Sequence, residues 1–327
     1  QNEDSIMTIN LKPHTQYFDS QRFSHPDFDR VMDGIDELVK LGGVIPTISC
    51  VAGPSRVGKS VVIEQARKMY SSDPSAEQQV IASISIEPNC TPKMIVEALV
   101  TAIGLKPTGN SQKVREQLRG MAKKKGIRLL IVDELQHALP AHQSTSKKTQ
   151  AIADMLKLIS DETKASILLV GLENTPTLLQ NKFNEQRTSK NTQEKQLFGR
   201  SFPAIVIRRI KLAETERFST IMRGYKTLFD LVKKQFGITY PDITKPNLML
   251  MLWVACKGCF GRLRFLFALS LESVNNGGTV TLRNLEITYD RYISDKAPLN
   301  PFTCDNKELK RIANTIERQW VVEEEGL

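Results

Sequence analysis

The sequence has little of what stabilises small secreted proteins or anchors membrane proteins. Its 327 residues include five cysteines, an odd number that disfavours a disulfide framework and fits a reducing compartment. No run approaches the roughly 18 apolar residues of a membrane-spanning helix. The N-terminus is polar and lacks the apolar core of a signal peptide. We therefore expect a cytoplasmic protein with no membrane contact.

Metal-binding patterns are also scarce. Cys256 and Cys259 form a single C-x-x-C, and no cluster of histidines or cysteines supplies the other two ligands that a structural zinc site needs. We expect these two cysteines to pack near a helix start. The sequence shows no internal repeat.

Positive charge is in excess. Lysine and arginine number 45 against 36 acidic residues, which gives a formal net charge of +9. A basic balance favours a polyanionic partner, with nucleic acid first. The alternative is a surface charge that only keeps the protein soluble.

The order of expected elements indicates an α/β class. Five strands are expected at 47–52, 80–86, 128–133, 166–171 and 204–210, with helices between them at 59–70, 92–103, 111–125 and 149–162. The strands at 129–132 and 167–170 are apolar throughout, which is typical of a parallel sheet sandwiched by helices.

The pattern divides the chain into four parts. Residues 1–30 are expected to be an extended segment that docks on a partner, with a helical pattern beginning at 31. Residues 31–212 would form the α/β nucleotide-binding domain, and 213–293 a small all-helical lid domain. Residues 294–327 would form a tail that carries a short amphipathic helix near 307–320.

A phosphate-binding loop is the strongest motif. The spacing G-x-x-x-x-G-K-[ST] is met by Gly53, Pro54, Ser55, Arg56, Val57, Gly58, Lys59 and Ser60, and Val61 follows in the expected helix. A buried strand precedes the loop, so its backbone N–H groups and the helix dipole would form an anion site. We expect Lys59 to reach the phosphates of ATP and Ser60 to bind Mg²⁺. The alternative is a chance glycine turn.

Two acids end the third expected strand. Asp133 and Glu134 follow four apolar residues, at the carboxyl end of a strand, where open α/β sheets bind ligands. We expect Asp133 to hold Mg²⁺ and Glu134 to act as the general base for the attacking water. The alternative is a pair of solvated acids at a strand end.

Further polar residues are candidates for contacts with the nucleotide. Asn174, with Thr175 second, follows the fourth strand and would contact the γ-phosphate or its water. Arg200 precedes the last strand and would reach a neighbouring subunit's nucleotide as an arginine finger. Arg264, with Arg262 as the fallback, lies near the start of a lid helix and would approach the nucleotide from the lid side. Surface salt bridges are the alternative for these arginines.

Together these residues resemble the AAA+ ATPases, with a P-loop NTPase core and a helical lid. Within that class the chain is similar to the initiator and helicase-loader branch, and there to the TnsC/TniB regulators of Tn7-like transposons. The resemblance covers about 20–295. It rests on 53–60, 133–134, 171–174, Arg200 and 261–264, with the segment 25–28 that precedes the core. The strand end at 172–174 departs from the usual Gly-Thr/Leu-Pro-Glu pattern.

The resemblance implies a function. Such proteins bind ATP with Mg²⁺ and oligomerise on double-stranded DNA as hexameric or heptameric rings or as filaments. They receive a target signal from a TniQ/TnsD-type adaptor and activate a DDE transposase, TnsB-like and in some systems with TnsA. ATP turnover then limits or disassembles the platform. The expected location is the bacterial cytoplasm, at the nucleoid.

Two loops are candidates for DNA contact. Thr91 and Lys93 lie after the second strand, where a helix N-terminus would bind a phosphate. Lys147 and Lys148 lie in a stretch rich in hydroxyl groups after the acidic pair. Such contacts would follow the DNA backbone and weaken with salt. The basic run 123–125 ranks below them because it ends a helix, where cations favour the dipole.

Three other functions remain open. A helicase loader or replication initiator shares most of these motifs, although the segment after 295 is short for a winged-helix domain. A DNA scaffold could use ATP binding alone with little hydrolysis, against which Glu134 argues. A signalling P-loop NTPase that acts on proteins is disfavoured by the basic charge.

Overall fold

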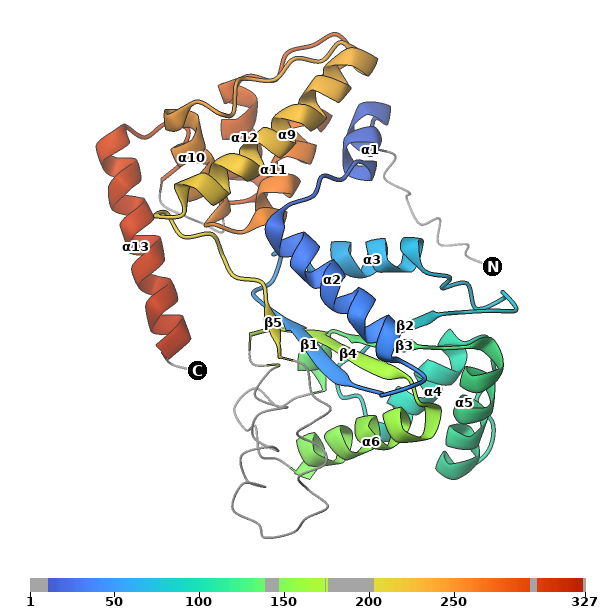
Figure 1. The fold of residues 1–327 in the computed structure, drawn as a ribbon. Helices are drawn as coiled ribbons and strands as arrows, with labels where there is room; N and C mark the ends of the chain where they lie inside the picture. The colour runs from blue at the N-terminus through green and yellow to red at the C-terminus, as the bar shows by residue number, and fades with distance from the viewer. Residues whose placement is uncertain (1–10, 139–146, 174, 176–202, 295–298, 326–327) are drawn as a thin grey trace, which may run out of the picture. The chain divides into compact units, whose positions relative to one another are not determined.

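The computed structural model describes residues 11–138, 147–173, 175, 203–294 and 299–325. Its chain forms two units (Figure 1). The core unit spans Pro26–Arg208, and the helical unit combines the described residues up to His25 with those from Arg209 onward.

The core unit is built on a parallel sheet. Its strands are β1 (Ile48–Ala52), β2 (Ile81–Ser85), β3 (Leu129–Asp133), β4 (Ser166–Gly171) and β5 (Ile205–Val206), the last shorter than the expected 204–210. They lie in the order β2-β3-β4-β1-β5, and neighbouring strands pair in parallel. In this register Ala52 lies opposite Gly171, and Val132 opposite Leu169. The phosphate-loop strand and the acidic strand are therefore separated by β4.

Helices cover both faces of this sheet, as the uniformly apolar strands predict. Helices α2 (Pro26–Leu41) and α3 (Lys59–Met69) lie on one face, and α4 (Pro92–Ala102), α5 (Ser111–Lys125) and α6 (Lys147–Thr163) on the other (Figure 1). Leu130 and Val132 pack in the cluster formed with α4–α6. The alternate β3 side chains, Leu129 and Ile131, are equally buried and point to the opposite face.

The N-terminal part of the chain differs from the expected extended segment. It forms α1 (Pro13–Ser20), and α2 begins at Pro26, five residues before the expected position of 31. Proline is favoured at a first helical position because it needs no N–H partner there. Asp27 and Asp29 in the first turn of α2 also favour a helix start.

The helical unit consists of α1 with α9 (Thr215–Phe236), α10 (Pro246–Cys256), α11 (Phe260–Glu272), α12 (Leu282–Tyr292) and α13 (Asn306–Glu325). Its centre is aromatic: Phe229 stacks on Phe18 and on Tyr240, with ring centroids 5.4 Å and 3.8 Å away. Cys256 and Cys259 are both buried, the first ending α10 and the second preceding α11.

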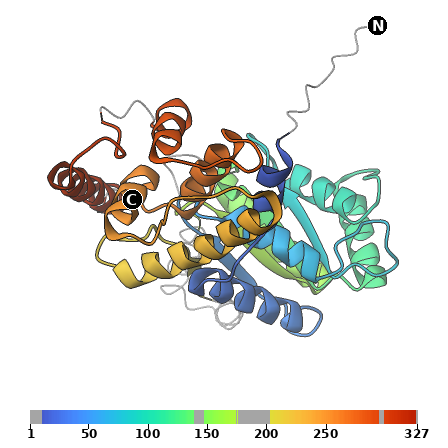
Figure 2. The same cartoon turned by 90° about the horizontal axis from the view of Figure 1, so that it is seen from above.

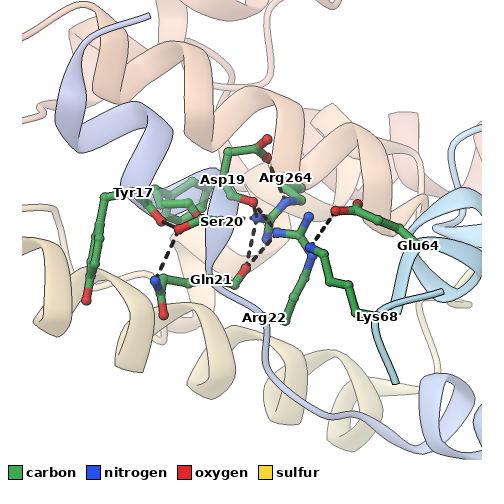
Figure 3. A network of polar contacts seen from close by, with 9 residues as sticks. Tyr17, Asp19, Ser20, Gln21, Arg22, Glu64, Lys68 and Arg264 are labelled. Atoms are coloured by element: carbon green, nitrogen blue, oxygen red, sulfur yellow. Dashed lines mark hydrogen bonds and ion pairs between the residues drawn. The ribbon is translucent and has the colours of Figure 1, made fainter. Parts of the chain in front are cut away.

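Helix α1 is bound to the helical unit by polar contacts as well as by Phe18. Nε of Arg264 donates to Oδ1 of Asp19 at 3.2 Å, and its Nη2 donates to the carbonyl oxygens of Phe18, Asp19 and Gln21 at 2.8–3.0 Å (Figure 3). The guanidinium also lies 5.2 Å from the Phe18 ring centroid. Four acceptors and a ring thus fix the end of α1.

The C-terminal segment is also part of this unit. Helix α13 runs beside α10 (Figure 2) and is longer than the expected helix at 307–320. Leu309, Ala313, Ile316 and Trp320 recur at helical spacing and are buried in the core of the unit. This apolar face explains why residues after 306 pack instead of forming a tail.

Replacing Phe18 with alanine should lower the free energy of unfolding by about 3–5 kcal/mol, because it empties a fully buried aromatic site. Phe265→Ala on α11 is the matched control, since that ring is 41% exposed and should cost much less. Urea unfolding of both variants gives the comparison. Equal effects would contradict the assigned contribution of the buried Phe18 ring to the stability of the helical unit.

Candidate nucleotide-binding site

The phosphate loop connects β1 to α3 in a conformation that depends on its glycines. Gly58 has φ 104°, in the left-handed region that favours glycine, and is the residue before α3. Gly53 is buried against the backbone after β5, where a β-carbon would overlap the carbonyl oxygen of Ile207. Val57 is also buried, whereas Ser55, Arg56 and Ser60 are exposed.

Charge at the loop has the sign that a phosphate requires. The ammonium group of Lys59 donates to the carbonyl oxygens of Gly53 and Pro54, both at 2.7 Å. The first N–H groups of α3, around Ser60 and Val61, lie at the positive end of the helix dipole. The loop therefore presents a lysine and a helix N-terminus together, which suits a triphosphate.

Asp133 ends β3 in a partly desolvated position. Burial raises the pKa of its carboxyl group. The backbone N–H of Glu134, which donates to Oδ1 of Asp133 at 2.8 Å, and the charge of Lys59 lower this pKa without cancelling the rise. The negative charge of Glu134 raises it further. A partly buried carboxylate disfavoured in its charged form gains from a divalent cation.

Glu134 has an unusual backbone conformation. Its φ of 57° and ψ of 36° lie in the left-handed region, and the 3-10 helix η1 (Leu135–His137) follows at once. The carboxylate oxygen Oε2 accepts a hydrogen bond from the side-chain amide of Gln136. Non-glycine residues in this region carry strain and concentrate at functional sites. The left-handed conformation of Glu134 changes the direction of the chain between β3 and η1.

The end of β4 lies between the phosphate loop, which follows β1, and the acidic pair at the end of β3. Gly171 is paired with Ala52, the last residue before the phosphate loop. Thr175 follows in a turn, its N–H donating to the carbonyl oxygen of Leu172 at 2.9 Å, and its side chain is fully buried. Asn174, the expected γ-phosphate contact, lies outside the described residues.

Three arginines are candidates for contact with the nucleotide. Arg200 lies outside the described residues. Arg264 is buried in the helical unit, where it binds the end of α1, and Nη2 of Arg262 donates to the carbonyl oxygen of Ile293 at 2.9 Å. In this structure the guanidinium of Arg264 makes structural contacts with the end of α1, and its contact with the nucleotide stays a prediction.

The expected DNA-contacting residues lie at two helix starts. Thr91 precedes α4 and accepts a hydrogen bond from the N–H of Met94 at 3.4 Å, and Lys93 pairs with Glu97 at 3.5 Å on the surface. Lys147 and Lys148 open α6, so the structure begins that helix two residues before the expected position of 149. Lysines at a helix start are opposed by the dipole, and an anion bound there would offset this cost.

Sequence reasoning missed Gln136. This residue follows the acidic pair by two positions and supplies the amide that contacts Glu134. A polar residue two positions after the motif, next to the apolar Leu135, was the feature that could have indicated it.

A five-stranded parallel sheet, a phosphate loop after β1, acids after β3 and a helical unit define an AAA+ P-loop NTPase fold. The model of the bacterial TniB protein family matches residues 15–193, more than half of the chain. The chain belongs to the TniB family.

A solved structure agrees on the fold. The chain resembles the ADP form of the Aeropyrum pernix ORC2 protein with a TM-score of 0.55 and 10% identity, over 88% of this chain and 75% of that one. It is less similar to the A. pernix ORC1 protein in complex with DNA, at a TM-score of 0.48 and 14% identity, over 81% and 64% of the two chains. No curated protein matches the chain. Among the described residues, no helix is long and apolar enough to cross a membrane.

The substitution Asp133→Asn should stabilise the nucleotide-free protein at pH 7.5. A raised pKa in the folded state means that the charged carboxylate costs stability above that pKa. As the pH falls through the raised pKa toward the ordinary value of 3.8, Asp133 becomes protonated and its charge no longer destabilises the parent protein. The stability advantage of Asp133→Asn over the parent should therefore shrink. Urea unfolding from pH 7.5 down to the ordinary value of 3.8 measures this trend.

Asp230→Asn is the matched control, because Asp230 is exposed on α9 and its substitution should change stability little. A variant at position 133 that is less stable than the parent at pH 7.5 would contradict the assigned cost of the buried charge.

Proposed function

We propose that this protein is an ATP-dependent, DNA-binding AAA+ regulator of transposition. The observation that carries the proposal is the placement of the phosphate loop and of Asp133–Glu134 at the same edge of one parallel sheet, in a chain of the TniB family. ATP hydrolysis would control its assembly on double-stranded target DNA.

The residues at this edge fit MgATP. Gly58, Lys59 and the N-terminus of α3 would bind the β- and γ-phosphates, and Ser60 with Asp133 would hold Mg²⁺. The raised pKa of Asp133 supports this assignment, because a bound cation would relieve the desolvated carboxylate. Bound Mg²⁺ would supply neutralisation of phosphate charge.

Glu134 is the proposed general base. Its carboxylate would take a proton from the water that attacks the γ-phosphate. The left-handed backbone at Glu134 and the amide of Gln136 restrict where this carboxylate lies. Asn174 would orient the same water, and Arg200 of a neighbouring subunit would stabilise the charge that develops in the transition state.

DNA would be bound through its backbone. The net charge of +9 favours a polyanion, and Thr91, Lys93, Lys147 and Lys148 are the proposed contacts. The surface pair of Lys93 with Glu97 contributes little energy and would not prevent contact with a phosphate. Contacts of this kind read no base sequence.

Membership in the TniB family supports a proposal for assembly and partners. We propose a homo-oligomer, as a hexameric or heptameric ring or a filament, that surrounds the duplex. It would connect a TniQ/TnsD-type adaptor to a DDE transposase of the TnsB type in the bacterial cytoplasm. An expected role of Arg264 at the nucleotide would require release of its contacts with α1.

Glu134→Gln should retain ATP binding and lock assemblies on DNA, with kcat lowered by about 10²–10⁴-fold, because the variant has no general base. Electron microscopy with duplex DNA and ATP should show rings or filaments that persist, and a phosphate-release assay should show the fall in turnover. Lys59→Ala should bind no nucleotide and form no such assemblies.

Glu77→Gln is the control for the amide substitution, since Glu77 is exposed in the loop before β2. Normal ATP turnover by the Glu134 variant would overturn the base assignment. A wild-type protein that stays monomeric with saturating ATP and duplex DNA would overturn the proposed function.

Lys147→Ala/Lys148→Ala should weaken DNA binding and reduce the slope of log affinity against log salt by about 1 for each lysine–phosphate pair removed. The matched control is Lys123→Ala/Lys124→Ala, which removes the same charge from the exposed end of α5. Fluorescence anisotropy between about 50 and about 200 mM salt spans the range in which such pairs weaken. Equal slopes for the two variants would remove the α6 lysines from the interface.

A further inference from the structure

We propose that Gln136 is a positioning residue for the general base, and that the hydroxyl group of Thr175 fixes the orientation of Gln136. This inference rests on the proposed ATP hydrolysis and adds to it a relay from the end of β4 to Glu134. The relay consists of Thr175, Gln136 and Glu134.

The backbone around Glu134 is already fixed, but its side chain is not. The N–H of Glu134 donates to Asp133, and its carbonyl oxygen accepts from the N–H of His137 at 3.0 Å. Nδ1 of His137 lies 2.8 Å from the carbonyl oxygen of Ile86 and holds η1 against the end of β2. The carboxylate has its own rotatable bonds, and the amide of Gln136 is the group that donates to it.

That amide must face one way. Nε2 of Gln136 donates to Oε2 of Glu134, which leaves Oε1 of Gln136 directed away from the carboxylate. If the amide turned over, two acceptor oxygens would face each other. Something that donates to Oε1 would therefore select the orientation in which Gln136 stabilises the ionised base.

Thr175 can be that donor. Its Oγ1 and the Oε1 of Gln136 are both buried, and neither has a hydrogen-bond partner among the described residues. A buried polar atom without a partner is costly, so this pair calls for an explanation. A hydroxyl group can donate and an amide oxygen accepts, so the two are chemically complementary.

Gly171 lies beside both atoms, which are not hydrogen-bonded to each other in this structure. A β-carbon built on Gly171 would overlap Oγ1 of Thr175 and would lie 3.1 Å from Oε1 of Gln136. Both oxygens therefore lie close to the bare α-carbon of Gly171. The absence of a side chain at the last residue of β4 gives them the space in which to approach each other.

The relay would connect the carboxyl ends of two strands of the sheet. Gly171 is paired with Ala52 beside the phosphate loop, and Glu134 follows β3 on the other side of β4. Thr175 and Gln136 would span the distance between the ends of β4 and β3, at the edge of the sheet where ATP is proposed to bind. A carboxylate held in this way is preorganised, which accelerates proton transfer without a change in ATP affinity.

Gln136→Leu and Thr175→Val should each lower kcat for ATP hydrolysis by about 10–100-fold, because a misplaced base loses much of its contribution. The dissociation constant for a fluorescent ATP analogue should stay within about twofold of the parent value, since ground-state binding is not changed. Thr175→Ser keeps the hydroxyl group and should restore turnover.

Two further variants separate positioning from a general structural effect. Gly171→Ala should lower kcat in the same way by filling the space between the oxygens. Adding Gln136→Leu to Glu134→Gln should slow turnover no further, because the relay acts only through that carboxylate.

Matched controls carry the same chemical changes on exposed helices. Gln112→Leu removes an amide that donates to Glu116 at 3.2 Å on α5, and Thr101→Val removes a hydroxyl group on α4. Gly120→Ala adds a methyl group where nothing lies within 4 Å. All three should hydrolyse ATP at the parent rate.

Normal kcat in Gln136→Leu or in Thr175→Val, with Glu134→Gln inactive, would overturn the relay alone. Failure of Thr175→Ser to restore turnover would do the same. A wild-type protein that hydrolyses no ATP with DNA present would overturn the proposed function, and the relay with it.

Discussion

Parallel pairing of β4 with both β1 and β3 is the constraint on which the site depends. Because all three strands run the same way, their carboxyl ends meet at one edge of the sheet. The phosphate loop, the end of β4 and the acidic pair come from positions far apart in the chain and are brought together only by this register. A shift by one residue would turn the strand side chains to the opposite face, and the close packing of the helices on both faces opposes the repacking that this would require.

The site contains several locally unfavourable features. Glu134 occupies the left-handed region, Asp133 is partly desolvated, and Gly53 is packed so closely that no side chain fits. The surrounding sheet is apolar and buried on both faces, and its burial offsets such costs. Local strain at otherwise consistent elements is the pattern expected where a protein does chemistry.

Much of the fold could be predicted because it follows from local patterns. Strands β1–β4 and helices α3–α6 lie within one or two residues of their expected bounds, and the phosphate loop and the acidic pair are contiguous motifs. What was missed depends on contacts between distant residues. The hydrogen bond from the backbone N–H of Lys12 to the carboxylate of Glu272 spans 260 residues. The approach of Gln136 and Thr175 to Gly171 depends on the pairing of β3 with β4. No local pattern reports such contacts.

Arg264 shows that a residue's type and local setting are compatible with more than one role. An arginine near a glycine at a helix start suits an anion, and the same features suit a helix end rich in carbonyl groups. Here the carbonyl oxygens at the end of α1 and Asp19 satisfy a guanidinium that would otherwise be buried without partners. A buried guanidinium needs hydrogen-bond acceptors, and here backbone carbonyl oxygens at the end of α1 provide them. Any phosphate that recruited Arg264 would have to compete with four hydrogen bonds already made.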